Sequence, residues 1–440
     1  MKSFVRRVLP VALVLLLCAG FVPPAGADMV PPPVDDITYI FNAADLPRFE
    51  APDGGEAVRV GLTEEQIAEL LGLGHDFNLD IAVTGMDGLA GAELLIELGP
   101  LLEVGLQTLR FQTEMIPLGP HILRDASLTV PLGALRDMSS RADTIRIGLY
   151  EVPYGRERIV LSGDWENESD GVPIDNMENY YNYQYPLTLS FKYFTPPLLS
   201  ARPGSVHVPD MPAVIQYFFE DDVINTHSLP RSWRQGDTMV AKICSDGVFG
   251  VYDSQYIEYN FLAGHWARVA FGFLNTRSVI NGYPDYTFRP DQPITRAEFV
   301  VMLDRLLNIE PRENGLLAPC PDWDDIPDWA VDSAYTARVL GIVQGDGHGS
   351  FNPNAPIMRQ EMFVMVYRAM RFGFPQGIPT GTPMAADSVD IAEWALDPIH
   401  HLHHMGIISS SHLSIRPLDA ATRAEAAQIL YNLLIYERNP

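Results

Sequence analysis

Cysteine, positive charge and long apolar runs are all scarce in this chain, and each scarcity excludes a class of protein. Only 3 of the 440 residues are cysteine, too few for a scaffold held together by disulfides. The 30 basic residues face 56 acidic ones for a net charge of −26. This balance argues against binding nucleic acid or anionic membranes through bulk charge. Long apolar runs are confined to the N-terminus, so no membrane insertion is expected once that run is removed.

The N-terminus has the pattern of an export signal, predicted at residues 1–27. Lys2, Arg6 and Arg7 form a positive region, the apolar stretch VLPVALVLLLCAGFV follows, and the small residues AGA precede Asp28. A retained membrane anchor is the alternative, which the prolines and glycine interrupting this short core make weaker. Cleavage before Asp28 removes the three basic residues and shifts the net charge from −26 to −29.

Two cysteines, Cys244 and Cys320, remain after such cleavage. They fall in different predicted domains, which favours free thiols over a bridge. The sequence itself leaves their pairing open.

Catalytic and cofactor-binding motifs are missing as well. We find no Gly-x-Ser-x-Gly elbow, phosphate loop, dinucleotide fingerprint or HExxH pair. Asp164, Glu166 and Glu168 suggest the carboxylate pair of a glycosidase. They lie in a Gly/Asn/Ser-rich acidic turn, where a solvated loop or weak cation binding is favoured. We therefore predict that the protein is not an enzyme and holds no cofactor.

A histidine cluster, HHLHH, is a candidate metal site. His400 and His404 would share one helix face, as zinc ligands do at i and i+4, and His401 and His403 lie between them. No complete shell of further ligands adjoins them in the sequence. The segment is interpreted as part of a helix, and no metal is predicted.

Composition divides the rest of the N-terminal half into a linker and two β-rich domains. The Pro- and Asp-rich stretch 28–56 is expected to be a linker. Residues 57–170 carry short runs bounded by turn residues, and several, such as 77–83 and 144–152, alternate with period two. A second β-rich domain is predicted at 171–258. The regular spacing favours a sandwich-like fold, interrupted by one helix where Thr63 and Gln66 of LTEEQIAELLGLG form a capping-box pattern.

The C-terminal part contains an internal repeat, predicted in three copies: copy one (259–308), copy two (319–374) and copy three (384–437). The spacing from Trp to Arg is 30 positions for Trp266–Arg296, 30 for Trp329–Arg359 and 29 for Trp394–Arg423. Gly282 and Gly345 each lie 16 positions after their Trp. Each copy is expected to hold two helices joined by a Gly/Asp-rich turn. Because one helical hairpin cannot bury its apolar stripe alone, the three copies should pack together.

The second helix of copy one begins in the stretch ITRAEF. Thr295 and Glu298 stand three residues apart, the spacing of a capping box. Arg296 between them has no structural role in this interpretation, because a cation gains nothing from the positive end of a helix dipole. A planar guanidinium does pair well with a carboxylate. Together with free backbone N–H groups at a helix start, it would form an anion site.

The repeat resembles the S-layer homology family through its Trp-Ala, Gly-Tyr, Phe-x-Pro and Thr-Arg-x-Glu elements, over about two-fifths of the chain. The resemblance implies an all-α, pseudo-three-fold helical domain. It also implies non-covalent attachment to a secondary cell-wall polysaccharide, whose pyruvate ketal carboxylate is read by the motif Arg. The residues expected to bind the polysaccharide are Arg296, Arg359, Arg423, Trp266, Trp329, Trp394, Gly282, Gly345, Asp325 and Asp390.

The bland alternative is that each Trp is a core residue and each Arg a solvated charge. The copies also differ. Met358 replaces the capping Thr of copy two, and copy three has Ser410 and Ile415 where the others have Gly and Phe. We therefore expect the sites to be built around copies one and two.

These observations predict a multidomain α+β protein, with a β-rich region followed by the all-α repeats. The leading hypothesis is a secreted, non-catalytic cell-surface protein anchored to wall polysaccharide, with possible self-association in a surface layer. One alternative is an anchored glycan-active enzyme with its catalytic site in the β-rich region. Another is a β-rich module that binds an external ligand.

Overall fold

The fold is taken from a computed structural model of the chain. It describes residues 34–52, 54–114, 123–152, 156–166, 173–175, 184–193, 213–220, 223–235, 238–245, 247–252, 264–283, 285, 287–308, 320–372, 374, 390–408 and 414–438. The signal peptide predicted at 1–27 lies outside these residues.

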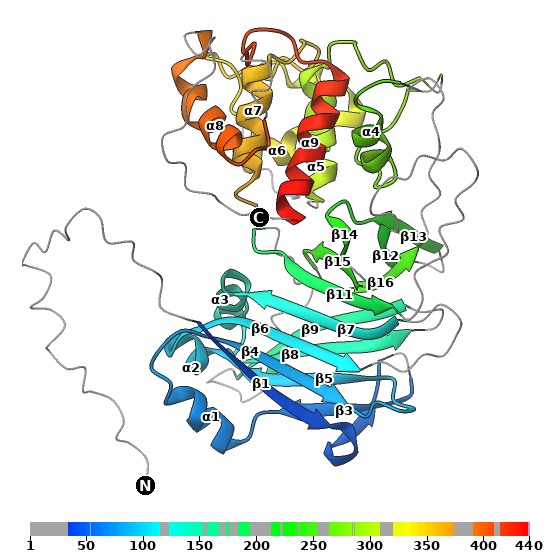
Figure 1. Cartoon of the computed structure of the whole chain (residues 1–440), viewed down its shortest axis with the longest axis vertical. Helices are drawn as coiled ribbons and strands as arrows, with labels where there is room; N and C mark the ends of the chain where they lie inside the picture. Colours follow the sequence, from blue (N-terminus) through cyan, green and yellow to red (C-terminus); the bar gives the residue numbers. More distant parts are fainter. Residues whose placement is uncertain are drawn as a thin grey trace, which may run out of the picture. The chain divides into compact units, whose positions relative to one another are not determined.

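The first of two sheets contains seven strands and is part parallel, part antiparallel (Figure 1). In spatial order they are β1 (Asp35–Asn42), β4 (Phe77–Thr84), β6 (Leu106–Glu114), β7 (Leu123–Pro131), β11 (Leu187–Tyr193), β15 (Thr238–Ile243) and β14 (Ser232–Gln235). β1, β4 and β6 run parallel, and the remaining neighbours are antiparallel. The parallel pairs require crossover connections, and helices provide some of them.

The second sheet has nine strands. Its order is β13 (Val223–Ser228), β12 (Ala213–Glu220), β16 (Gly247–Tyr252), β9 (Arg156–Glu166), β8 (Thr144–Val152), β5 (Gly91–Glu97), β3 (Glu56–Gly61) and β2 (Arg48–Glu50), with β10 (Pro173–Asp175) beside β9. One hydrophobic core draws on both sheets, with Leu79 and Ile81 from β4 facing the same cluster as Val58 and Val60 from β3. The predicted sandwich-like arrangement is therefore confirmed only in that two sheets share one core.

Short helices cover parts of this β-rich region. They are η1 (Ala43–Asp45), α1 (Glu64–Leu71), α2 (Leu98–Glu103) and α3 (Leu132–Arg141). The predicted capping box of α1 is confirmed, because Gln66 N donates to Thr63 Oγ1 at 3.2 Å and Thr63 N donates to Gln66 Oε1 at 2.9 Å. α2 and α3 were not predicted.

The structure differs from the predicted domain boundaries. Strands β1 and β2 lie within the stretch 28–56 that was expected to be a linker, and apolar residues of β1 (Ile37, Tyr39 and Phe41) pack against the core. No boundary lies between 170 and 171 in the described strands, since β7 pairs with β11 and β9 pairs with β16. Long-range strand pairing decides both points, and composition does not reveal it.

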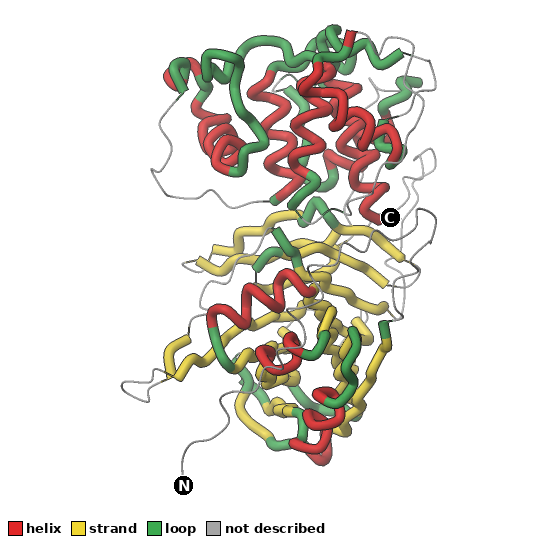
Figure 2. The backbone as a smooth tube through the Cα atoms, turned by 90° about the vertical axis from the view of Figure 1, so that its left-hand side faces the viewer, coloured by secondary structure: helices red, strands yellow, loops and turns green. Residues whose placement is uncertain are grey.

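The C-terminal part is helical, as predicted (Figure 2). Its elements are α4 (Arg268–Asn275), α5 (Arg296–Leu307), η3 (Trp323–Asp325), η4 (Asp328–Ala330), α6 (Val331–Val339), α7 (Arg359–Ala369), α8 (Glu393–His404) and α9 (Arg423–Arg438). The apolar stripe of α5, with Phe299 fully buried, belongs to one core cluster shared by all three copies. None of the described helices is both long and apolar enough to span a bilayer.

The first helix of each copy packs against the second helix of the preceding copy. α6 contacts α5, α8 contacts α7, and α4 contacts α9, while α5 also packs against α7 and α9. Every described copy therefore completes its core with a neighbour, which explains why a single helical hairpin would not suffice.

Candidate functional site

Each motif arginine is the first residue of a second helix and is largely buried. The side chains of Arg296, Arg359 and Arg423 are 7%, 12% and 6% exposed. Each Nε donates to a backbone carbonyl of the next copy in cyclic order. The acceptors are Phe351 at 2.7 Å, Ile415 at 2.8 Å and Phe288 at 3.0 Å, respectively. The alternative of a solvated surface charge is therefore excluded.

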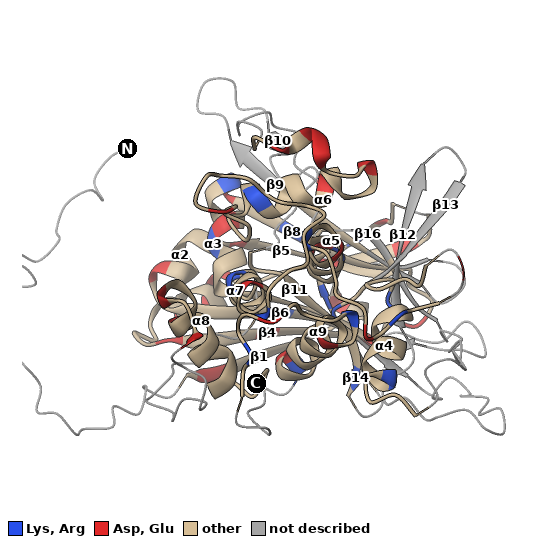
Figure 3. Cartoon of the chain, turned by 90° about the horizontal axis from the view of Figure 1, so that it is seen from above, with Lys and Arg blue, Asp and Glu red and all other residues tan. Residues whose placement is uncertain are grey.

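A carboxylate of the same neighbouring copy pairs with each guanidinium. The Nη1–Oε1 distances are 2.8 Å for Arg296–Glu361, 2.6 Å for Arg359–Glu425 and 3.1 Å for Arg423–Glu298. Figure 3 shows α5, α7 and α9 end-on, with basic and acidic segments at each. Copy one pairs with two, two with three and three with one, so the ion pairs close a cycle. The prediction that Arg296 has no structural role was wrong.

A second cycle is made by the backbone just before these helices. Ile294 N donates to Ala421 O at 2.9 Å, Ala421 N to Ile357 O at 2.9 Å, and Ile357 N to Ile294 O at 3.0 Å. The three equivalent segments thus bond to one another in a closed ring. The ring fixes the position of every second helix, and therefore of its arginine.

The N-termini of the second helices are not open anion sites. Arg296 N donates to Ala355 O at 3.0 Å and Ala297 N to Pro353 O at 3.0 Å, and the first two N–H groups of α7 and α9 are occupied in the same way. In α5 the third N–H, of Glu298, is bonded to Thr295 Oγ1 at 3.2 Å. The expectation of free backbone N–H groups beside the arginine was wrong, because the neighbouring copy uses them.

The helix caps follow the sequence prediction. Thr295 N donates to Glu298 Oε2 at 2.9 Å, which completes the capping box of α5. In copy two, Met358 N still donates to Glu361 Oε2 at 2.9 Å. Each of these glutamates therefore has two roles, since one oxygen accepts the cap N–H and the other accepts the arginine of the preceding copy.

The three motif tryptophans lie on the surface. Trp266, Trp329 and Trp394 are 57%, 58% and 53% exposed, although the alanine after each is buried. Soluble proteins bury most of their tryptophan surface. The alternative that these residues belong to the core is therefore excluded.

Two of the tryptophan turns contact the arginine helix of the preceding copy. For Trp329, the turn η4 that contains it packs against α5, and for Trp394, Ala392 N donates to Gln360 Oε1 of α7 at 3.0 Å. The contacts between Asn354 Nδ2 and Asp325 O (3.3 Å) and between His265 Nε2 and Asp291 Oδ1 (3.4 Å) each lie within one copy. Asn354 precedes Ala355, which binds Arg296 N, and Gln360 follows Arg359. The first two boundaries between copies therefore each hold one exposed tryptophan turn and one buried arginine.

The remaining predicted site residues have other positions. Gly345 has φ +78°, and a Cβ there would lie 3.0 Å from Gly349 and Ser350 backbone atoms. A Cβ at Gly282 would lie 3.0 Å from Thr287 O. Both glycines therefore shape the turn. Asp325 and Asp390 are exposed near the starts of the first helices.

Comparison with known proteins identifies this arrangement. The S-layer homology domain matches residues 262–300 and 321–363. The C-terminal part of the chain carries S-layer homology domains. The third copy, which departs most from the motif, is not among the matched residues.

The relatives include enzymes and surface-layer proteins. Exoglucanase XynX of Acetivibrio thermocellus is 33% identical over 42% of this chain and 17% of its own length. Amylopullulanase of Thermoanaerobacterium thermosulfurigenes is 32% identical over 40% of this chain and 9% of its own length. S-layer protein EA1 of Bacillus anthracis is 29% identical over 38% and 19%, respectively. The chain spans less than a fifth of the length of these relatives, and the likeness lies in the S-layer homology region. The domain and the surface-protein relatives together indicate a secreted protein anchored at the cell wall.

Sequence reasoning missed several residues of the S-layer homology ring. The glutamates were assigned only to caps, although the Thr-Arg-x-Glu spacing repeats in copies one and three. Asp322 also went unnoticed, yet its carboxylate accepts Phe351 N at 2.8 Å and Asn352 N at 2.6 Å. These hydrogen bonds hold the pKa of Asp322 below its usual value against the opposing effect of burial. The partners of these glutamates and of Asp322 are distant in the sequence, and no local motif indicates them.

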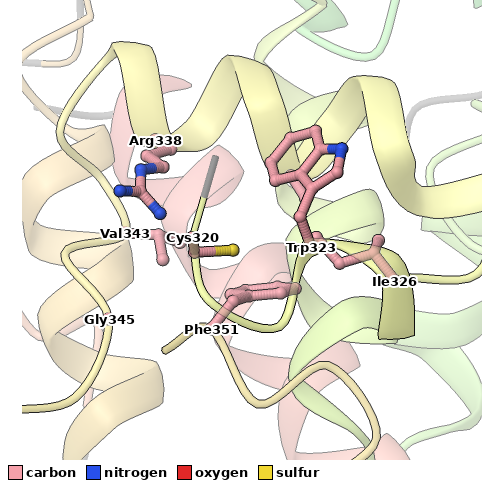
Figure 4. A pocket seen from close by; sticks show the side chains of 8 residues that line it. Cys320, Trp323, Ile326, Arg338, Val343, Gly345 and Phe351 are labelled. Carbon is pink, nitrogen blue, oxygen red and sulfur yellow. The ribbon is translucent and has the colours of Figure 1, made fainter. Parts of the chain in front are cut away.

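A small hollow lies behind the Phe351 loop of the second S-layer homology copy (Figure 4). Cys320 Sγ points into it between Trp323 and Phe351, and Arg338 is the charged residue of the lining. Burial raises the pKa of the Cys320 thiol. Cys320 and Cys244 are both buried, and neither forms a disulfide. The residues that line the hollow pack behind the loop of this copy. Their mainly apolar side chains leave few hydrogen-bonding groups for a sugar.

The histidine cluster forms the C-terminal end of α8. His401 Nδ1 lies 3.3 Å from Asp397 O, and its ring lies 5.0 Å from that of Tyr367. Within the described residues no group of three or more His, Cys, Asp or Glu side chains is placed to hold a metal ion. This helix packs against α7 and contributes Ile399 and Leu402 to the core of the helical part.

Asp304 is a partly buried carboxyl group at the boundary between copies one and two. It lies on α5 of copy one and accepts a 2.7 Å hydrogen bond from Ser333 Oγ of copy two. Burial raises the pKa of Asp304 to about 6, against opposing effects of Ser333 and Arg305. A raised carboxyl pKa favours the protonated folded state, so the stability it contributes is present below about pH 4 and is lost as pH rises through about 6.

We expect Asp304→Asn to raise the free energy of unfolding at pH 7 by up to about 3 kcal/mol. The asparagine stays uncharged and can still accept from Ser333. The stability of the variant should change less between pH 5 and pH 7 than that of the parent. Urea unfolding of both proteins at the two pH values tests this. A variant less stable than the parent at pH 7 contradicts it.

Proposed function

We propose that this protein is a non-catalytic surface protein held non-covalently on a secondary, pyruvylated cell-wall polysaccharide. In this proposal its three S-layer homology copies form a pseudo-three-fold anchor, and the β-rich region is displayed from the wall. The observation that carries it is the exposure of the motif tryptophans at boundaries that also hold a buried arginine. An indole face supplies apolar area for a sugar ring, and a guanidinium pairs with a ketal carboxylate.

The first two boundaries are the proposed binding grooves. At the boundary of copies one and two, η4 with Trp329 packs against α5, which begins at Arg296. At the boundary of copies two and three, Ala392, two residues before Trp394, bonds to Gln360 beside Arg359. The glutamate partner of each arginine contacts Nη1 and leaves other N–H donors of the guanidinium unused. Nη2 of Arg296 and of Arg359 has no hydrogen-bond partner among the described residues. The ketal carboxylate would accept from this nitrogen.

A glycan-active enzyme anchored in the same way is the second candidate. The names of relatives such as exoglucanase XynX favour it, although the likeness does not extend to the β-rich region. In that region Glu93 is a buried carboxylate, which accepts from Arg59 Nε at 2.7 Å and from Tyr150 Oη at 3.1 Å. Such a network is an ion pair with a phenol, whereas glycoside hydrolysis needs two opposed carboxyl groups. Release of reducing sugar from wall or plant glycans by the whole protein would favour the enzyme.

We expect the double variant Trp329→Ala/Trp394→Ala to bind isolated cell walls about ten-fold or more weakly. Covering an exposed indole removes on the order of 100 Å² of apolar area from water, or ~2 kcal/mol. The measurement is co-sedimentation of the whole protein with walls, before and after extraction of the polysaccharide and after mild acid removal of the ketal. The tryptophans are preferred to the arginines because replacing a buried arginine also disturbs the ring.

Ile40→Ala is the control, since Ile40 is an apolar residue on β1 that is even more exposed (69%) than the two tryptophans. It should bind as the parent does. Parent binding that survives extraction of the polysaccharide would contradict the anchor. Parent binding that survives loss of the ketal alone would contradict the pyruvylated ligand.

A further inference from the structure

We infer that strand β1 is a docking edge for a second molecule of this protein, and that two β1 strands pair antiparallel about a two-fold axis at Tyr39. Pairing of this kind involves the β-rich region alone and needs no polysaccharide, so it goes beyond the proposed function. Strand addition draws its affinity from main-chain hydrogen bonds and its specificity from the side chains that meet across the new pair.

The outer side of β1 presents unused backbone groups. β1 is the end strand of the seven-stranded sheet, and among the described strands it pairs with β4 alone. Asp35 N donates to Asp76 O at 3.4 Å, so the backbone groups of Asp35 face β4. Successive residues of such a strand direct their N–H and C=O groups to alternate sides. Those of Asp36, Thr38 and Ile40 therefore point away from β4, and no described residue is bonded to them.

The opposite end of the same sheet is closed by the chain itself. Its end strand, β14, begins at Ser232, whose carbonyl oxygen accepts from Arg277 Nη2 at 3.0 Å and from Arg277 Nε at 3.3 Å. Lys242 N donates to Arg231 O at 2.8 Å, so the carbonyl of the next residue, Ser232, points away from β15. Ser232 and Arg277 are 2% and 1% exposed. An arginine thus covers the outward carbonyl at this end, whereas the described residues provide no such cover at β1.

β1 also lacks the features that usually protect an edge strand. Protected edges are short, or carry lysine, proline or a bulge. β1 has eight residues, DDITYIFN, without lysine or proline, and it pairs with β4 without a shift in register. Ile40 lies on the face of the sheet away from the core and is 69% exposed, more than any other described large apolar residue. An edge of this kind is a template for another strand.

A second β1 complements the first when it runs antiparallel. Residues whose backbone groups point outward must lie opposite one another, so Thr38 pairs with Ile40 of the second molecule. Each of the two Thr38–Ile40 pairs then exchanges two N–H···O bonds. On the core side Ile37 lies opposite Phe41 of the second molecule, and Tyr39 lies opposite its own counterpart. These three residues are only partly buried in one molecule, and aromatic and β-branched cross-strand pairs stabilise a sheet.

Charge selects this arrangement over the others. Asp35 and Asp36 lie at one end of β1. The antiparallel register places Asp36 opposite Asn42 and separates the two Asp36 residues by ~20 Å, which exceeds the Debye length of about 8 Å. A parallel pair would place both aspartates about 5 Å from their own counterparts. Moving the axis to Thr38 would place Asp36 opposite Ile40. A second molecule in the first register is therefore the occupant that fits this edge.

Sedimentation equilibrium of the whole protein without residues 1–27, in the absence of walls, tests the docking edge. We expect a reversible monomer–dimer equilibrium between about 1 and 100 µM protein. Ile40→Lys should raise the dissociation constant about ten-fold or more, because it removes an apolar contact and brings two like charges together. Leu418→Lys is the control, since Leu418 is an exposed apolar residue of the helical part (58%). It should leave the constant within about two-fold of the parent value.

Thr38→Pro gives a second measurement at the edge. Proline removes the outward N–H and leaves the hydrogen bonds to β4 in place, so the dimer should again weaken about ten-fold or more. Thr38→Val keeps the N–H and should form the dimer as the parent does. Far-ultraviolet circular dichroism confirms that each variant is folded.

Disulfide cross-linking tests the register. The two Tyr39 Cα atoms should lie about 4.5 Å apart, which allows a disulfide, whereas the two Ile40 Cα atoms should lie about 8 Å apart, which does not. After oxidation, Tyr39→Cys should therefore run as a dimer on a non-reducing gel and Ile40→Cys as a monomer. The native Cys244 and Cys320 are buried.

A parent that stays monomeric at about 100 µM would overturn the docking edge. A dimer that both Ile40→Lys and Thr38→Pro leave unchanged would overturn it as well. Cross-linking of Ile40→Cys in preference to Tyr39→Cys would overturn the register. Co-sedimentation with walls is run where the protein is monomeric, so Ile40→Ala remains its control and none of these outcomes bears on the anchor.

Discussion

Arg231→Met is expected to lower the free energy of unfolding by about 3–5 kcal/mol. Arg231 precedes β14 and is 3% exposed, and its partner Glu437 near the end of α9 is 2% exposed. Arg231 Nε lies 3.0 Å from both carboxylate oxygens, Nη1 donates to Phe372 O at 3.0 Å, and the guanidinium lies 4.1 Å from the Phe374 ring centre. Methionine fills similar volume but leaves a buried carboxylate and a carbonyl without donors, which is the costly outcome for buried ion pairs.

Urea unfolding followed by far-ultraviolet circular dichroism measures the loss. Arg48→Met is the control, because Arg48 pairs with Glu56 at 2.7 Å on the surface, where the side chains are 43% and 56% exposed. That substitution should cost about 0–1 kcal/mol. The double variant Arg231→Met/Glu437→Leu should recover much of the loss, since it removes both charges. A loss below about 1 kcal/mol for Arg231→Met would show that the pair does not hold β14 and α9 together.

Glu361→Leu is expected to cost about 3 kcal/mol, the second large effect. Glu361 accepts the N–H of Met358 at 2.9 Å and pairs with Arg296 at 2.8 Å. Leucine removes the cap acceptor and leaves a guanidinium that is 7% exposed without its counter-charge. The loss should therefore exceed that of a helix cap alone, which is about 1 kcal/mol.

A double-mutant cycle with Arg296→Met isolates the contribution of the ion pair. The sum of the stability losses in the two single variants should exceed the loss in the double variant by about 1–3 kcal/mol, because the two residues are in direct contact. Glu65→Leu is the control, as Glu65 is an exposed residue in the first turn of α1, and should change stability by at most about 0.5 kcal/mol. Strict additivity of Arg296→Met and Glu361→Leu would mean that the cycle of ion pairs does not couple the copies.

Features that depend on a few consecutive residues could be read from the sequence. The capping boxes at Thr63 and Thr295 need only the residue three positions later, and both form. The apolar stripe beginning at Phe299 has helical period and is buried. The exact Trp-to-Arg spacing likewise revealed the repeat, and with it the S-layer homology resemblance, because a repeated unit must meet the same local rules each time.

Features that depend on distant partners could not be read in this way. The stretch 28–56 has the composition of a linker, yet Asp35–Asn42 pairs with β4 because the sheet offers it a parallel edge. The domain boundary expected at 170 fails for the same reason, since strands from either side pair across it. Composition indicates whether a segment favours turns and exposure to solvent. Strand order depends instead on hydrogen bonds between segments that are distant in the sequence.

Local patterns in the sequence were enough to predict the repeated helical unit, the cap that starts α5, its buried apolar stripe and the secreted, wall-anchored character of the protein. The role of Arg296 depends on the tertiary structure. The residue follows a local cap but finds its partners, Phe351 O and Glu361, some 55 and 65 positions along the chain. The sequence alone does not show whether an arginine side chain faces solvent, a ligand or a neighbouring carboxylate. Its role is fixed by which copy is brought beside it, and that depends on closing the ring.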